Sequence, residues 1–78
     1  MYKVLKHTYT KMIEDVDYAC EIVCKSKKFE NCYIFFAEEV KDIMKICYCN
    51  QRIDLEIVED EDNDNPLCEF VFNPNQIG

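Results

Sequence analysis

Two segments near the C-terminus whose side chains follow a period of two constrain the fold of this chain most strongly. In the first run, three aliphatic residues alternate with two acidic ones over residues 53–57, and the second run covers residues 67–72. A period of two is typical of a strand that has one face in water. The segment 59–66 between the runs is polar and rich in turn-forming residues. The sequence therefore predicts a C-terminal antiparallel hairpin.

The rest of the chain has shorter or mixed patterns. Residues 2–7 alternate weakly, which is compatible with a short strand or an early helical turn. After Thr10, apolar residues recur at spacings of three and four, and this predicts an amphipathic helix over residues 11–25. The aromatic run 31–36 predicts a strand at the centre of the sheet, covered on both faces. A second amphipathic helix is expected over residues 37–49.

These elements predict a small α+β fold with the order β-α-β-α-β-β. We expect a sheet of about four strands, two helices packed on it, and the hairpin at its C-terminal end. The 78 residues suit a single compact domain over 1–78, with a loose tail at 73–78. Hydrophobic residues make up 49% of the chain, which exceeds what an acidic disordered segment carries. The chain is therefore expected to fold.

Acidic residues are concentrated in the second half of the chain. Eight of them, and no basic residue, lie between Asp54 and Glu69, and the net charge of the whole chain is −7. Such a surface attracts cationic partners and repels nucleic acid and anionic membranes. A small basic cluster at Lys25, Lys27 and Lys28 does not offset this charge. We therefore expect a protein partner with a basic surface, and neither direct nucleic-acid binding nor membrane binding.

The chain contains six cysteines in apolar surroundings. Neither a signal peptide nor a membrane span is visible, so a cytoplasmic location and reduced, buried thiols are expected. Disulfides and a metal site assembled from distant thiolates remain open alternatives. The cysteines are Cys20, Cys24, Cys32, Cys47, Cys49 and Cys68.

Catalytic, metal and cofactor motifs are weak or missing in the sequence. Asp60, Asp62 and Asp64 match the first positions of a calcium-binding EF-hand loop, but Asn65 and Val71 stand where Gly and Glu are needed. The only glycine is Gly78, so a glycine-rich phosphate loop is excluded. The only histidine is His7, near the N-terminus, which makes a nucleophile–base pair improbable. We predict a protein that is not an enzyme and uses no metal or cofactor.

The acidic surface is therefore the candidate binding site. Carboxylates along a strand and its loop offer Arg and Lys the hydrogen bonds that phosphates normally provide, so the chain is expected to mimic nucleic acid in a basic groove of a partner such as a nuclease. Small size and acidity are shared, as a likeness of type without a common motif, with the inhibitors that phages and other mobile elements direct against host nucleases in anti-defence. The predicted partner-binding residues are Asp54, Glu56, Glu59, Asp60, Glu61, Asp62 and Asp64.

Two alternatives belong to different classes. In the first, the chain is a structural or regulatory module that forms a homodimer through a sheet edge or a helix face. In the second, exposed and reactive cysteines make it a metal or redox protein. The oligomeric state separates the first alternative from a monomeric acidic inhibitor, and the exposure of the cysteines tests the second.

Overall fold

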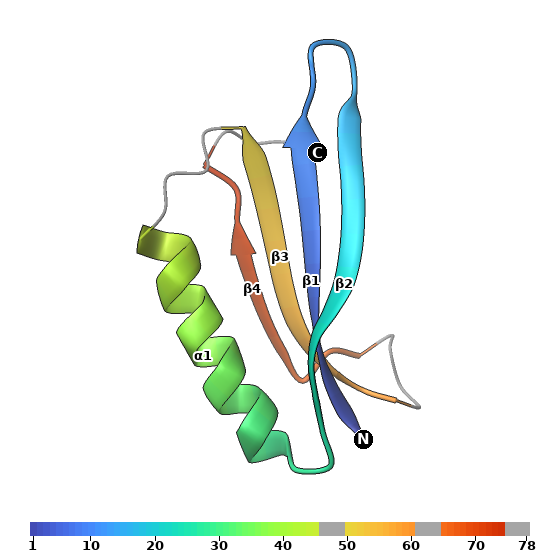
Figure 1. Cartoon of the computed structure of the whole chain (residues 1–78), viewed down its shortest axis with the longest axis vertical. Coiled ribbons are helices and arrows are strands. Elements are labelled where there is room, and N and C mark those ends of the chain that lie inside the picture. Colours follow the sequence, from blue (N-terminus) through green and yellow to red (C-terminus); the bar gives the residue numbers. More distant parts are fainter. Residues whose placement is uncertain (46–49, 61–64, 75–78) are drawn as a thin grey trace.

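The computed structural model describes residues 1–45, 50–60 and 65–74. Its four strands form one antiparallel sheet in the order β2-β1-β3-β4. The one helix of the described residues runs along the β4 side of the sheet in the view of Figure 1, and the β1–β2 hairpin projects beyond it. The elements are β1 (Tyr2–Lys11), β2 (Val16–Ser26), α1 (Phe29–Lys45), β3 (Gln51–Glu59) and β4 (Cys68–Phe72).

The α+β class, the N-terminal strand and the C-terminal hairpin are confirmed, but the predicted order β-α-β-α-β-β and its two helices are wrong. The order of the described elements is β-β-α-β-β. The segment predicted as a helix over 11–25 contains a turn and strand β2. Its apolar residues fit a period of two as well as a helical period. Pairing with β1 favours the strand over the helix in this segment. Ile13, which the helix would have buried, is 101% exposed in the turn.

The strand predicted over residues 31–36 is also wrong, because this segment lies inside α1. The side chains of α1 that face the sheet recur at spacings of three and four from Phe29 onward, which continues a helical period through the aromatic run. Tyr33 and Ile34 lie on the outer side of the helix, 51% and 59% exposed. The helix predicted over 37–49 forms the second half of α1, and residues 46–49 lie outside the described residues.

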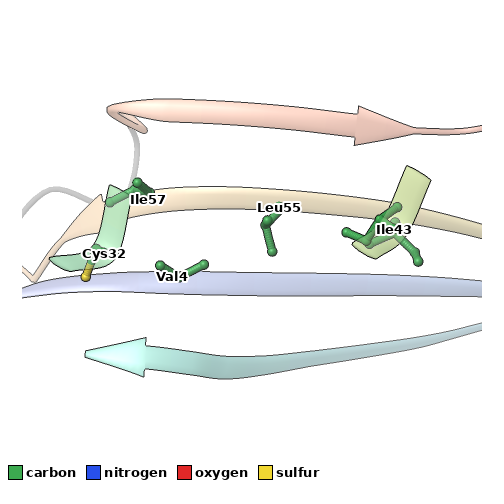
Figure 2. Packing of buried hydrophobic residues seen from close by; sticks show 6 residues of the cluster. Val4, Cys32, Ile43, Leu55 and Ile57 are labelled. Carbon is green, nitrogen blue, oxygen red and sulfur yellow. The ribbon is translucent and has the colours of Figure 1, made fainter. Parts of the chain in front are cut away.

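The core lies between α1 and one face of the sheet. Its centre consists of aliphatic side chains from the two middle strands together with two residues of α1, and each is at most 1% exposed. Figure 2 shows them gathered around β1 and β3. Aromatic residues at the rim, including Tyr2 packed edge-on against Phe29 at 5.7 Å, extend this core. The central residues are Val4, Cys32, Ile43, Ile53, Leu55 and Ile57.

The cysteines differ in exposure. Cys32 is buried in the core, and burial, together with the neighbouring Cys24 thiol, raises its pKa, so it remains protonated and unreactive. Cys24 and Cys68 are half-buried, whereas Cys20 is exposed on β2, which corrects the expectation of burial for that residue. Cys47 and Cys49 lie outside the described residues.

Two further predictions from the sequence concern the C-terminal tail and the presence of a membrane span. Most of the predicted loose tail, 73–78, lies outside the described residues, which end at Pro74. Among the residues that the structure describes, no helix is both long enough and apolar enough to cross a membrane.

Candidate functional site

The candidate site lies on the sheet face that points away from α1. Lys6 of β1 reaches Glu39 of α1 with 3.6 Å between Nζ and Oε2, so Lys6 belongs to the helix side. Strand side chains alternate between the two faces, which places its neighbours Leu5 and His7 on the other face. The register sets Leu5 beside Glu56 of β3. The helix α1 lies on the other face of the sheet, and we call the face that bears His7 and Glu56 the open face.

The open face is hollowed where β1, β3 and β4 lie side by side. The hollow has a volume of about 330 Å³ and is open to solvent on one side. Its lining is mostly charged or aromatic, and three of its side chains are carboxylates. We call it the acidic hollow, and its residues are His7, Tyr9, Arg52, Asp54, Leu55, Glu56, Glu69, Phe70 and Val71.

His7 of β1 forms hydrogen bonds to residues of both neighbouring strands, β2 and β3. Its Nε2 lies 3.0 Å from Oε1 of Glu56, and its Nδ1 lies 2.7 Å from the hydroxyl of Tyr18. An ionised carboxylate only accepts hydrogen bonds, so a neutral His7 donates from Nε2 to Glu56 and accepts at Nδ1 from Tyr18. Loss of solvation, and then the Cys20 thiol, raise the pKa of Tyr18. The Tyr18 phenol is therefore a donor that positions His7, and a poor nucleophile.

The Asp54 carboxylate is paired with Arg52 of the same chain. Arg52 donates from Nε to Oδ1 and from Nη2 to Oδ2 of Asp54, both at 2.9 Å, which is a bidentate pair. This hydrogen bonding raises the pKa of Arg52. The Arg52 guanidinium also lies 5.1 Å from the centre of the Tyr9 ring, and Tyr9 in turn contacts Tyr18. Asp54 therefore shapes the hollow, and its charge is largely offset by Arg52.

Glu56 and Glu69 are directly opposite each other on β3 and β4. Like charges at opposite positions of neighbouring strands are destabilising. His7 contacts one oxygen of Glu56, and Glu69 is exposed at the side of the hollow. The two glutamates thus concentrate negative charge at the β3–β4 side of the hollow.

The remaining predicted residues lie apart from this pair. Asp60 follows β3, where its carboxylate contacts Lys3 Nζ at 2.6 Å and the N-terminal amine of Met1 at 3.8 Å. Glu59 is exposed at the end of β3. The predicted residues Glu61, Asp62 and Asp64 lie outside the described residues. The structure therefore brings Asp54 and Glu56 together in the hollow and places Asp60 in a separate ion pair with Lys3.

Sequence reasoning missed His7, Tyr9, Arg52 and Glu69 as parts of the site. A signal for two of them was present, since the alternation in residues 2–7, if continued, puts His7 and Tyr9 on one face. Glu69 follows from the hairpin only when its register is known, because the register sets Glu69 opposite Glu56. The contact between β1 and β3 joins residues far apart in the chain, and no local pattern indicates it.

The ion pair at Asp60 gives a pH prediction. The hydrogen bond from Lys3, the largest influence, lowers the pKa of Asp60 below its ordinary value of 3.8. A depressed carboxyl pKa contributes stability above the unfolded-state value, and this contribution is lost as pH falls through the folded-state value. Lys3→Met should therefore be less stable than the unmodified chain at pH 7, and the difference should disappear near pH 2.

Urea melts from pH 7 to pH 2 test this prediction. Lys27→Met is the matched control, because it removes the same charge from an exposed residue outside the Asp60 ion pair. An unchanged difference between Lys3→Met and the unmodified chain over the whole pH range would show that Asp60 does not couple to folding.

Within 1–45, 50–60 and 65–74, no group of three His, Cys, Asp or Glu side chains is arranged to hold a metal ion. Comparison of the chain with protein-family models, with curated proteins and with solved structures finds no match.

Proposed function

We propose that this chain is a small protein-binding module without enzymatic activity, and that its acidic hollow receives Lys or Arg side chains from a basic surface of another protein. The observation that carries the proposal is the Glu56–Glu69 pair, in which two glutamates occupy opposite positions of neighbouring strands and both line an open hollow. A guanidinium or ammonium group placed between them removes their mutual repulsion and adds charge-assisted hydrogen bonds.

The surroundings of the pair support binding of a protein surface. Tyr18, Ile22 and Val71 lie on the same open face and are each about half exposed. Protein interfaces combine apolar and aromatic anchors with polar groups that fix orientation. The Arg52–Asp54 pair and the His7 hydrogen bonds hold the hollow in shape before a partner arrives, which reduces the entropy cost of binding.

The class of partner follows from charge. With a net charge of −7, the chain is attracted to basic proteins and repelled by phosphate backbones. A protein whose basic groove normally binds nucleic acid, such as a nuclease, presents the Lys and Arg side chains that the hollow requires. In such a groove the chain acts as an inhibitor or regulator that competes with nucleic acid.

A capture experiment followed by competition tests this function. Immobilised chain should retain a basic protein from its native source, mass spectrometry identifies that protein, and added nucleic acid should displace it from the chain. Binding should also weaken with salt, since exposed charges are screened beyond a Debye length of about 8 Å at physiological ionic strength. A captured partner that nucleic acid does not displace would contradict the competitive role.

The like-charge pair also predicts that stability and binding respond in opposite directions. Glu69→Lys converts the repulsive pair with Glu56 into an attractive one, so it should increase the free energy of unfolding by about 0.2–1 kcal/mol. The same substitution fills the cation site and should abolish binding of the basic partner. Urea melts and a binding assay on one protein preparation measure both effects. If Glu69→Lys bound the partner as well as the unmodified chain does, the partner would contact another surface.

A further inference from the structure

Strand β2 forms a long and unshielded edge of the sheet. It has 11 residues, whereas β4 at the opposite edge has five. All residues from Val16 to Ile22 are exposed, and this segment contains no proline. Natural proteins usually shorten or shield such edges, because unpaired backbone groups pair with another strand. The edge of β2 is therefore suited to adding a strand.

The hydrogen-bond pattern of the β1–β2 hairpin shows which residues offer these groups. Met12 N donates to Asp15 O at 2.7 Å, and this bond sets the phase of the hairpin. Antiparallel pairs alternate between hydrogen-bonded and non-hydrogen-bonded, so every second residue of β2 directs its N–H and C=O away from β1. Val16 fits this pattern, because its N–H donates to the Asp15 side chain at 2.7 Å. The residues with outward groups are Val16, Tyr18, Cys20 and Ile22.

The charges at the two ends of this edge are opposite. Acidic side chains lie in and before the first part of β2, and basic ones lie at and beyond its end. When two copies of the strand run antiparallel, the acidic end of each lies beside the basic end of the other. The acidic group is Glu14, Asp15 and Asp17, the basic group is Lys25, Lys27 and Lys28, and all six are exposed.

We infer that β2 pairs with β2 of a second copy of this chain around a two-fold axis at Cys20, which joins the two four-stranded sheets into one. In this register Tyr18 lies opposite Ile22 of the partner subunit, on the open face. Neighbouring registers are disfavoured by like charges. An axis at Ala19 sets Asp17 opposite the partner's Glu21, and an axis at Glu21 sets that residue opposite the partner's Glu21.

This dimer leaves the acidic hollow open, and Tyr18 of β2 connects the dimer seam to the hollow because it hydrogen-bonds to His7. The hollow is built on β1, β3 and β4, and the strand order places β2 at the other edge of the sheet. A two-fold axis perpendicular to the sheet keeps both hollows on the same side. The dimer therefore presents two cation sites, and it binds a partner with repeated basic sites more tightly than one copy does.

Sedimentation velocity over a range of concentrations tests the dimer with two matched variants. Ile22→Lys places a charge at the proposed interface twice, once on each side of the axis, and should raise the dimer dissociation constant by about tenfold or more. Val71→Lys adds the same charge to an equally exposed residue of the same face, but at the other edge of the sheet, and should leave the dissociation constant unchanged. An unmodified chain that is monomeric at about 1 mM would overturn the proposal.

Cross-linking tests the register. A short bis-maleimide reagent should join two copies through Cys20, and Cys20→Ser should lose this product while Cys68→Ser keeps it. The test does not depend on the stability of Ile22→Lys, because Cys20 is exposed and its replacement by Ser is conservative. A dimer that cross-links equally well without Cys20 would show that the copies associate elsewhere.

Discussion

Replacing Leu55 with alanine should lower the free energy of unfolding by about 2–5 kcal/mol, which is a large part of the stability of a domain of this size. Leu55 is 1% exposed at the centre of β3 and belongs to the core cluster that includes Cys32 and Ile43 of α1, and Figure 2 shows its side chain on β3. Its truncation removes buried apolar surface and leaves a cavity that the neighbouring β1 and α1 residues cannot fill completely. Urea melts of the purified chain measure the change.

Ile34→Ala is the control for this prediction. Ile34 is also a large aliphatic residue, but it is 59% exposed on the outer side of α1, so its truncation should change the free energy of unfolding by less than about 0.5 kcal/mol. If Ile34→Ala proved as destabilising as Leu55→Ala, residues 31–36 would be buried as a strand and the helix would be misplaced.

The second large effect concerns binding. Glu56→Gln together with Glu69→Gln removes both charges of the pair and should weaken binding of an oligo-arginine peptide by at least about tenfold, since each charge-assisted hydrogen bond contributes about 1.5–3 kcal/mol. Isothermal titration calorimetry at low salt measures the affinity. The fold should be retained, because glutamine is similar in size to glutamate and the like-charge repulsion is removed.

The matched control removes the same number of charges from α1. Glu30 and Glu38 are exposed on the helix, outside the hollow. Their replacement by glutamine changes the net charge of −7 by the same two units as the hollow variant does. A nonspecific charge effect would weaken peptide binding equally in both variants, which would contradict a localised site.

The sequence predicted the elements whose period is unambiguous. The hairpin of β3 and β4 was predicted because aliphatic and acidic residues alternate strictly in β3, and the pairing of Ile57 with Cys68 confirms its antiparallel register. β2 was mistaken for a helix because Val16 and Cys20 fit both periods. In such a segment the choice depends on pairing with β1, which is a tertiary interaction.

The aromatic run in α1 was mistaken for a strand for a related reason. Four consecutive apolar residues from Tyr33 to Phe36 suggest burial on two faces, but two of them are exposed. Extending the window to Phe29 and Ile43 shows the helical period, because the residues that face the sheet are then spaced by three and four. A longer window would therefore have favoured the helix.

The candidate site was predicted in part. The strand period placed Asp54 and Glu56 together on a wet face, and both line the acidic hollow. The sequence did not indicate that Asp54 forms an ion pair with Arg52 or that Asp60 forms one with Lys3. These contacts depend on side-chain geometry and on the register of β1 with β3, so net charge alone overstated how much of the acidic surface is available to a partner.

An NMR titration of the isotope-labelled chain with an oligo-arginine peptide tests the acidic hollow as a binding site, because it maps the contacted surface residue by residue. We expect saturable shift changes centred on Glu56, Glu69 and Val71, with smaller changes along α1, and we expect rising salt to reduce these changes. Shift changes centred on Glu30 and Glu38 of α1, or spread evenly over all acidic residues, would contradict the claim that the acidic hollow is the binding site.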